Sequence, residues 1–157
     1  MRDPQLALRL EAEPPVAGPR WGDGALLPYL GESIRLSLDG DCKEARLEAG
    51  RLHLPLPPAA TPRQVQDAAE SWLRAQALAV IGAQLVMECR RLGLKVPACS
   101  LSFSSRSGWA QPDDKGGLRF QWRLVEQPPE VIAQVVARAA ATLPRPGAIQ
   151  DLFALSA

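Results

Sequence analysis

The sequence is poor in histidine: among its 157 residues it contains one, His53. A zinc site made of three histidines, or of two histidines and a carboxylate, therefore cannot be assembled from a single copy of the chain. The three cysteines, Cys42, Cys89 and Cys99, are odd in number and lack C-x-x-C spacing. We interpret them as free thiols packed as small apolar residues in a reducing compartment, which excludes a disulfide framework.

Charge imbalance and long apolar runs are also missing. Eighteen basic residues stand against seventeen acidic ones, giving a formal charge of +1, so no nucleic-acid partner is expected from the overall charge. No run approaches the roughly 18 apolar residues of a membrane span. The N-terminus, MRDPQLALRLEAEPP, is charged where a signal peptide needs an apolar core. We therefore expect a soluble, cytoplasmic protein without a membrane partner.

The composition changes after the first twenty or so residues. Residues 1–23 are rich in proline, glycine, alanine and glutamate, which predicts a flexible leader before a folded domain at 24–157. Within this leader, Gln5, Leu6 and Leu8 are similar to the Q-L-x-L-F peptide by which bacterial proteins bind the DNA sliding clamp. Arg9 occupies the aromatic position of that peptide. A sliding-clamp contact and a plain disordered tail both stay open.

Short alternating segments separated by turn residues follow the leader. Residues 25–30 and 33–38 flank Gly31-Glu32, which predicts a β-hairpin. Residues 45–48 and 51–54 flank Ala49-Gly50 and predict two more strands, so we expect a small antiparallel meander with one solvated face. We interpret His53, in the last strand, as a surface or partly packed residue.

A long helix is predicted from Thr61-Pro62 to Leu92, with threonine as the N-cap and proline in the first helical position. Gly93 is expected to end the helix. Acidic side chains are interleaved with its arginines, so we interpret the polar side as a solvated face rather than a nucleic-acid surface.

The second half of the chain predicts another hairpin and another helix. Residues 99–105 and 118–124 alternate and bracket a loop at 106–117. In this loop, Trp109 is interpreted either as an anchor for a partner or as a ring folded back over the hairpin. Residues 128–143 carry apolar side chains at helical spacing after Pro128-Pro129, which predicts a helix with one buried face.

The segments Gln121-Trp122-Arg123-Leu124 and Pro128-Pro129-Glu130-Val131 resemble the start of the active-site helix in the YgjP-like zinc metallopeptidases, relatives of the SprT-like proteins. The resemblance implies an α+β, minimal zincin-like domain. In it, a small antiparallel sheet of hairpins packs against a long helix and a second helix that carries the active site. It also implies a zinc cofactor held by an H-E-x-x-H motif on that second helix.

At the motif positions implied by this resemblance, the sequence has Arg138, Ala139 and Thr142 in place of histidine, glutamate and histidine. The family's third histidine would lie in the segment 145–153, which contains none. The family's R-W-G-S loop corresponds here to Gly108-Trp109-Ala110. We therefore expect no catalytic residues, no metal ligands and no cofactor.

Three hypotheses of function follow. The first is a catalytically inactive relative that acts as a protein- or peptide-binding or regulatory module, with Trp109, Trp122 and Arg123 as contacts for the partner. The second is residual or altered zinc-dependent hydrolysis that uses the cysteines, His53 or acidic side chains. The third is a DNA-associated accessory protein.

Overall fold

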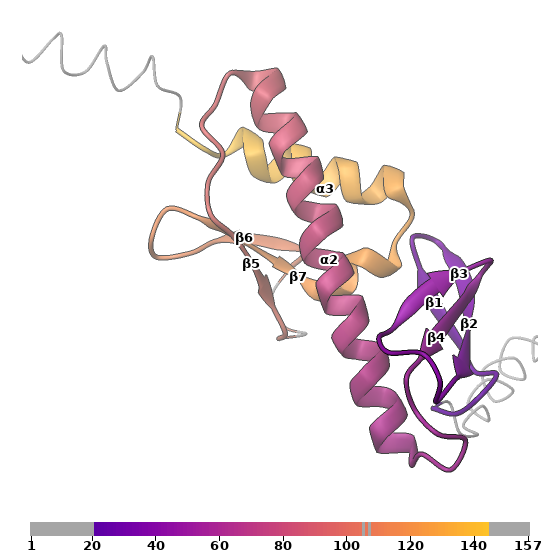
Figure 1. Cartoon of the computed structure of the whole chain (residues 1–157). Coiled ribbons are helices and arrows are strands. Elements are labelled where there is room, and N and C mark those ends of the chain that lie inside the picture. Colours follow the sequence, from indigo (N-terminus) through magenta and orange to yellow (C-terminus); the bar gives the residue numbers. More distant parts are fainter. Residues whose placement is uncertain (1–20, 105, 107, 145–157) are drawn as a thin grey trace, which may run out of the picture. The chain divides into compact units, whose positions relative to one another are not determined.

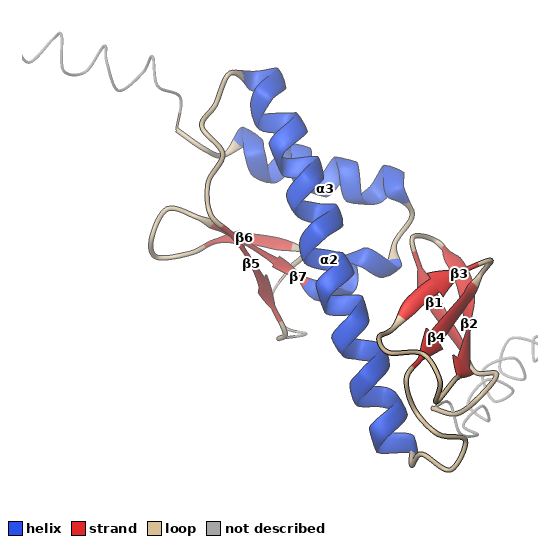
Figure 2. Cartoon of the chain, in the orientation of Figure 1, coloured by secondary structure: helices blue, strands red, loops and turns tan. Residues whose placement is uncertain are grey.

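The computed structural model describes residues 21–104, 106 and 108–144, which form an α+β fold of two small sheets and two α-helices (Figures 1 and 2). The predicted fold class is therefore confirmed. The described residues divide into two compact units: residues 21–28 with Ser33–Trp72 form one, and Tyr29–Glu32 with the described residues from Leu73 onward form the other. Most of the predicted leader, with its clamp-like peptide, and the segment 145–157 lie outside the described residues.

The first sheet contains strands β1 (Leu26–Tyr29), β2 (Glu32–Leu38), β3 (Arg46–Glu48) and β4 (Arg51–Leu54), in the order β1-β2-β4-β3. Ala49-Gly50 forms the predicted turn between β3 and β4, whereas the turn between β1 and β2 is Leu30-Gly31, one residue earlier than the predicted Gly31-Glu32. Leu30 and Gly31 have φ angles of 51° and 83°, and Ala49 and Gly50 have φ angles of 51° and 78°. Two successive residues with positive φ are typical of the tightest hairpin turns, which favour glycine in the second position.

The prediction of a purely antiparallel meander is wrong. Strand β2 pairs with β4 in parallel, with Leu36 opposite Leu52 and Leu38 opposite Leu54, and only β3 pairs antiparallel with β4. Alternation identified the buried face correctly, since Leu36, Leu52 and Leu54 are fully buried. Alternation carries no information on which strands are neighbours, because the same side chains can face the core whether two strands pair in parallel or antiparallel.

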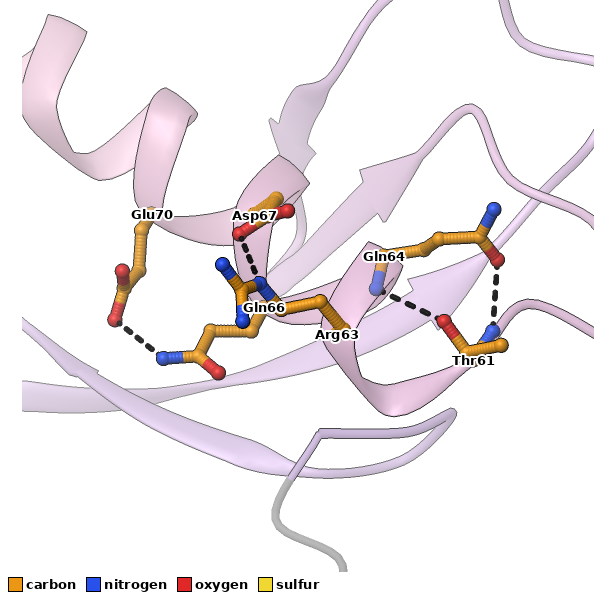
Figure 3. Close-up of polar contacts among 6 residues, drawn as sticks. All are labelled: Thr61, Arg63, Gln64, Gln66, Asp67 and Glu70. Atoms are coloured by element: carbon orange, nitrogen blue, oxygen red, sulfur yellow. Dashed lines mark hydrogen bonds and ion pairs between the residues drawn. The ribbon is translucent and has the colours of Figure 1, made fainter.

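Helix α2 (Pro62–Leu92) begins and ends where the sequence predicts. The Gln64 amide donates to Thr61 Oγ1 at 3.2 Å, and the Thr61 amide donates to Gln64 Oε1 at 2.8 Å, a reciprocal cap shown in Figure 3. Arg63 pairs with Asp67 at 3.3 Å on the solvated face (Figure 3). A fully or almost fully buried residue recurs at every fourth position: Val65, Ala69, Leu73, Ala77, Ile81, Leu85 and Cys89.

The second sheet consists of β5 (Cys99–Ser102), β6 (Ala110–Pro112) and β7 (Leu118–Gln121), in the order β5-β7-β6. The predicted hairpin between residues 99–105 and 118–124 is wrong, because β5 and β7 pair in parallel. The antiparallel partner of β7 is β6, which lies inside the predicted loop. Parallel neighbours need a crossover connection, and here the chain between them supplies β6.

The strand predicted to run to Leu124 instead ends at Gln121, and the 3₁₀-helix η2 (Trp122–Glu126) follows it. The Gln121 side chain accepts a hydrogen bond from the Arg123 amide at 3.4 Å, which caps this helix. Trp122, Leu124 and Val125 are all buried. Two consecutive buried residues break the alternation of a strand, but they suit a single helical turn.

Helix α3 (Pro129–Ala141) confirms the predicted helix and buries Ile132, Val136 and Ala140. The turn before β2 lies against the start of this helix: the Leu30 amide donates to the Val125 carbonyl at 2.8 Å, and the Gly31 amide donates to the Glu126 carbonyl at 3.0 Å. These two hydrogen bonds fix the chain as it enters α3. Among the residues described, no helix combines the length and the apolar character that crossing a bilayer requires.

Candidate functional site

A hollow of about 320 Å³ lies where α3 contacts β6. From the sheet it is lined by Trp109, Ala110, Pro112 and Leu118, and from the helix by Val135, Arg138, Ala139 and Thr142. The three positions at which the resemblance places H-E-x-x-H are therefore all on the wall of one concave surface. Among the described residues, Arg138 is the one charged member of this lining.

Helical geometry explains how α3 presents its part of the wall. Ala139 is 7% exposed, at the margin of the buried face that carries Val136, whereas Arg138 is exposed in the last turn of the helix. A cation in that position interacts favourably with the partial negative charge of the helix C-terminus. Thr142 is the C-cap residue, and its Oγ1 donates to the Ala139 carbonyl at 2.7 Å. The Thr142 hydroxyl is thus already engaged in a hydrogen bond to the backbone.

Strand β6 forms the opposite wall and one edge of its sheet. The Trp109 carbonyl accepts from the Gln121 amide at 2.9 Å, and the Asp113 amide donates to the Gly117 carbonyl at 3.0 Å. Backbone groups of an antiparallel strand point alternately toward and away from the neighbouring strand. The N–H and C=O of Ala110 and the C=O of Pro112 therefore point away from β7, toward the outer edge.

The turn from β6 to β7 is held by Asp113, whose Oδ1 accepts from the Lys115 amide at 2.8 Å and from the Gly117 amide at 2.7 Å. The Gly117 and Lys115 amides, in that order of effect, lower the pKa of the Asp113 carboxyl from its ordinary value. Gly117 cannot carry a side chain here, because a Cβ would lie 2.7 Å from the Ala98 carbonyl oxygen. This turn sets the position of Pro112 and Leu118 in the hollow.

The residues of the hollow do not fit the zinc ion that the family resemblance implies. A guanidinium stands where the first imidazole is required, a methyl group stands in place of the general base, and the Thr142 hydroxyl is bonded to the helix. Within residues 21–104, 106 and 108–144, no group of three histidine, cysteine, aspartate or glutamate side chains is placed to hold a metal. The segment 145–153 lies outside the described residues, and its sequence contains no histidine.

The remaining candidate ligands lie elsewhere in the fold. His53 is in β4, in the other unit, and its Nδ1 is buried without a hydrogen-bond partner in the described part of the chain. Burial raises the pKa of the Cys99 thiol, and burial with the neighbouring Glu88 charge raises that of Cys89. Because zinc binds the thiolate, these shifts oppose metal binding by either cysteine.

Of the three residues predicted to contact a partner, Trp109 lines the hollow and is 39% exposed. Trp122 is 4% exposed, and the Arg123 guanidinium lies 4.6 Å from the centre of its ring. Arg123 also pairs with Glu126 at 2.9 Å, and Arg74 lies 5.5 Å from the Trp122 ring. Trp122 and Arg123 thus belong to a cation–π cluster at the start of η2, separate from the hollow's lining.

The family resemblance includes Ala110 in the loop at 106–117, but the sequence does not predict that Ala110 and Pro112 form a strand that lines a site. They belong to a three-residue strand, too short for alternation to be recognised, and the glycines and proline around it favour a loop. Val135 is one of the apolar residues at helical spacing in the segment 128–143, but it lines the hollow and is only partly buried.

A family model described as the YgjP-like metallopeptidase domain matches residues 5–137 of this chain. Its match ends immediately before Arg138, the first of the three motif positions. Neither the curated proteins nor the solved structures searched gave a match.

Proposed function

The chain belongs to the YgjP-like metallopeptidase-domain family, and on this premise we propose that it is a non-hydrolytic member that binds an extended peptide or protein segment. The segment would occupy the hollow between α3 and β6. Fold membership alone does not carry an activity, so both parts of the proposal depend on the residues of that hollow.

The observation that carries the loss of hydrolysis is the set of side chains at Arg138, Ala139 and Thr142. Hydrolysis by a metallopeptidase needs a metal to polarise the carbonyl and to generate a nucleophile from water, and a carboxylate to move the proton. These three side chains offer no metal ligand and no base. Neither role has a substitute among the other lining residues, which are Trp109, Ala110, Pro112, Leu118 and Val135.

Two features of the same hollow support peptide binding. Its lining is mainly apolar and includes the half-exposed ring of Trp109, and rigid aromatic side chains are frequent anchors at binding surfaces. Along its sheet side, Ala110 and Pro112 direct backbone groups toward the outer edge of β6. An extended segment can add to such an edge by main-chain hydrogen bonds while its side chains enter the adjacent pocket.

Binding and hydrolysis can be measured together on a library of extended decapeptides and on a permanently unfolded protein, with tag-free full-length protein and added zinc. We expect binding without cleavage, and we expect Trp109→Ala to weaken binding. Phe103→Ala is the matched control, because Phe103 is an aromatic residue that is 62% exposed and lies outside the hollow. Zinc-dependent cleavage that a chelator abolishes, or equal binding by Trp109→Ala and wild type, would contradict the proposal.

A further inference from the structure

Resting on the proposed peptide-binding function, we propose that the bound segment carries an aspartate or glutamate side chain and that Arg138 recognises its carboxylate.

Arg138 is an exposed guanidinium, and the described residues that line the hollow with it include no carboxylate. In the described part of the chain it makes no ion pair. Two other arginines of the same unit are paired: Arg91 lies 2.9 Å from Glu88, and Arg123 lies 2.9 Å from Glu126. The positive charge of Arg138 therefore faces the hollow, where the described residues offer it no carboxylate.

The surroundings of Arg138 favour a carboxylate over a neutral side chain. A guanidinium presents parallel N–H donors that match the two oxygens of a carboxylate. Apolar neighbours such as Trp109, Pro112 and Val135 exclude water from one side of the pair, which strengthens the attraction relative to a fully solvated ion pair.

The backbone of β6 indicates that the carboxylate belongs to a side chain rather than to a chain end. Ala110 directs both its N–H and its C=O outward, and Pro112 adds a C=O, as the alternation of β6 requires. A bound segment that hydrogen-bonds to these groups places a residue from its middle, not its end, opposite Ala110. The segment then continues along the edge of β6 past Pro112. Its side chains then alternate toward and away from the hollow, so an acidic side chain can reach Arg138.

The test uses full-length protein and a decapeptide library in which one central position is fixed as aspartate, asparagine or lysine. We expect the aspartate pool to bind about tenfold or more tightly than the asparagine pool, the ratio typical of a hydrogen bond between charged groups. Arg138→Ala should abolish this preference, and Arg138→Glu should reverse it in favour of lysine. Because Arg138 is exposed, Arg138→Ala should stay close to the wild-type melting temperature, and Arg138→Glu should lower it slightly, since it places a negative charge at the C-terminus of α3.

Arg90→Glu is the matched control, since Arg90 is also an exposed arginine in the last turn of a helix but lies outside the hollow. It should leave the aspartate preference unchanged. A library that binds without preference, or with a preference that Arg138→Glu leaves intact, overturns the inference while the proposed function stands. If amidation of the peptide C-terminus removes binding and the change from aspartate to asparagine does not, the side-chain assignment is wrong. Absence of binding by every pool overturns the proposed function itself.

Discussion

Gly31 lies against Pro128 so closely that a Cβ on the glycine would be 2.9 Å from the Cα of the proline. The same glycine has a φ of 83° and donates its amide to the Glu126 carbonyl at 3.0 Å. The turn between β1 and β2 is thereby fitted onto the N-cap of α3, the helix whose last turn carries Arg138. No residue with a side chain meets both requirements, since the turn needs a positive φ and the contact leaves no room.

We therefore expect Gly31→Ala to be more damaging than Gly50→Ala. Gly50 occupies the equivalent position of the other turn, with a φ of 78°, but a Cβ there would meet nothing within 4 Å. Gly50→Ala should cost about 1 kcal/mol from backbone strain alone. Gly31→Ala should cost roughly 2–4 kcal/mol, because the contact with Pro128 adds an overpacking penalty. Urea titrations give the free energy of unfolding of each variant. Equal decreases in Gly31→Ala and Gly50→Ala would show that the contact between Gly31 and Pro128 adds no penalty.

Much of the local structure could be predicted because it depends on residues close together in the chain. Thr61 and Gln64 cap α2, Gly31 and Gly50 make the turns, and Pro129 opens α3. Strand pairing could not be predicted in the same way. The parallel neighbours Leu36 and Leu52, or Leu101 and Phe120, come together only through the tertiary fold. Alternation of side chains is the same whichever strand lies alongside.

Acid should loosen the turn between β6 and β7 through Asp113. Its folded-state pKa lies below the ordinary value of 3.8, chiefly because of the Gly117 amide and then the Lys115 amide. A group with a depressed folded pKa contributes stability that is present above the unfolded value and is lost as the pH falls through the folded one. The free energy of unfolding should thus decrease as the pH drops below about 4. The decrease should be smaller in Asp113→Asn.

The Asp113 prediction is checked by urea midpoints of wild type and Asp113→Asn between neutral pH and pH 2. The two curves should converge at low pH, where the wild-type carboxyl is protonated and accepts the Lys115 and Gly117 hydrogen bonds less strongly. Parallel curves over the whole range would show that the carboxylate does not stabilise the turn.

Rebuilding the motif should not rebuild an enzyme. The triple variant Arg138→His, Ala139→Glu, Thr142→His places two imidazoles one helical turn apart, but the chain supplies no third histidine beside them. Ala139 is 7% exposed, so the new glutamate would also be partly buried, and we expect a loss of stability of about 1–3 kcal/mol. Peptidase assays with added zinc should show no activity above the wild type, with Ala139→Glu alone as the control for folding. Zinc-dependent cleavage by the triple variant would show that a third ligand exists in the segment 145–153 or elsewhere.

The candidate site could be predicted in part. Counting along α3 from Pro128-Pro129 placed Arg138, Ala139 and Thr142 at the motif positions, and all three line the hollow. Trp109 was predicted as a contact for a partner, and that role stays a prediction, although the structure places the ring in the same lining. The sequence did not predict that β6 forms the opposite wall. Ala110 lies opposite Phe120 in the sheet, but a three-residue strand is too short for its sequence to specify this pairing.

We propose that this chain does not bind the zinc ion that its family implies, and the zinc content of the purified protein measures this. Tag-free, full-length protein is incubated with excess zinc and dialysed against a mild chelator. Metal is then measured per chain, with Cys42→Ser, Cys89→Ser and Cys99→Ser variants alongside to detect binding by thiolates. We predict far less than one zinc per chain in the wild type and in each variant. One equivalent of zinc retained by the wild-type protein would contradict the claim.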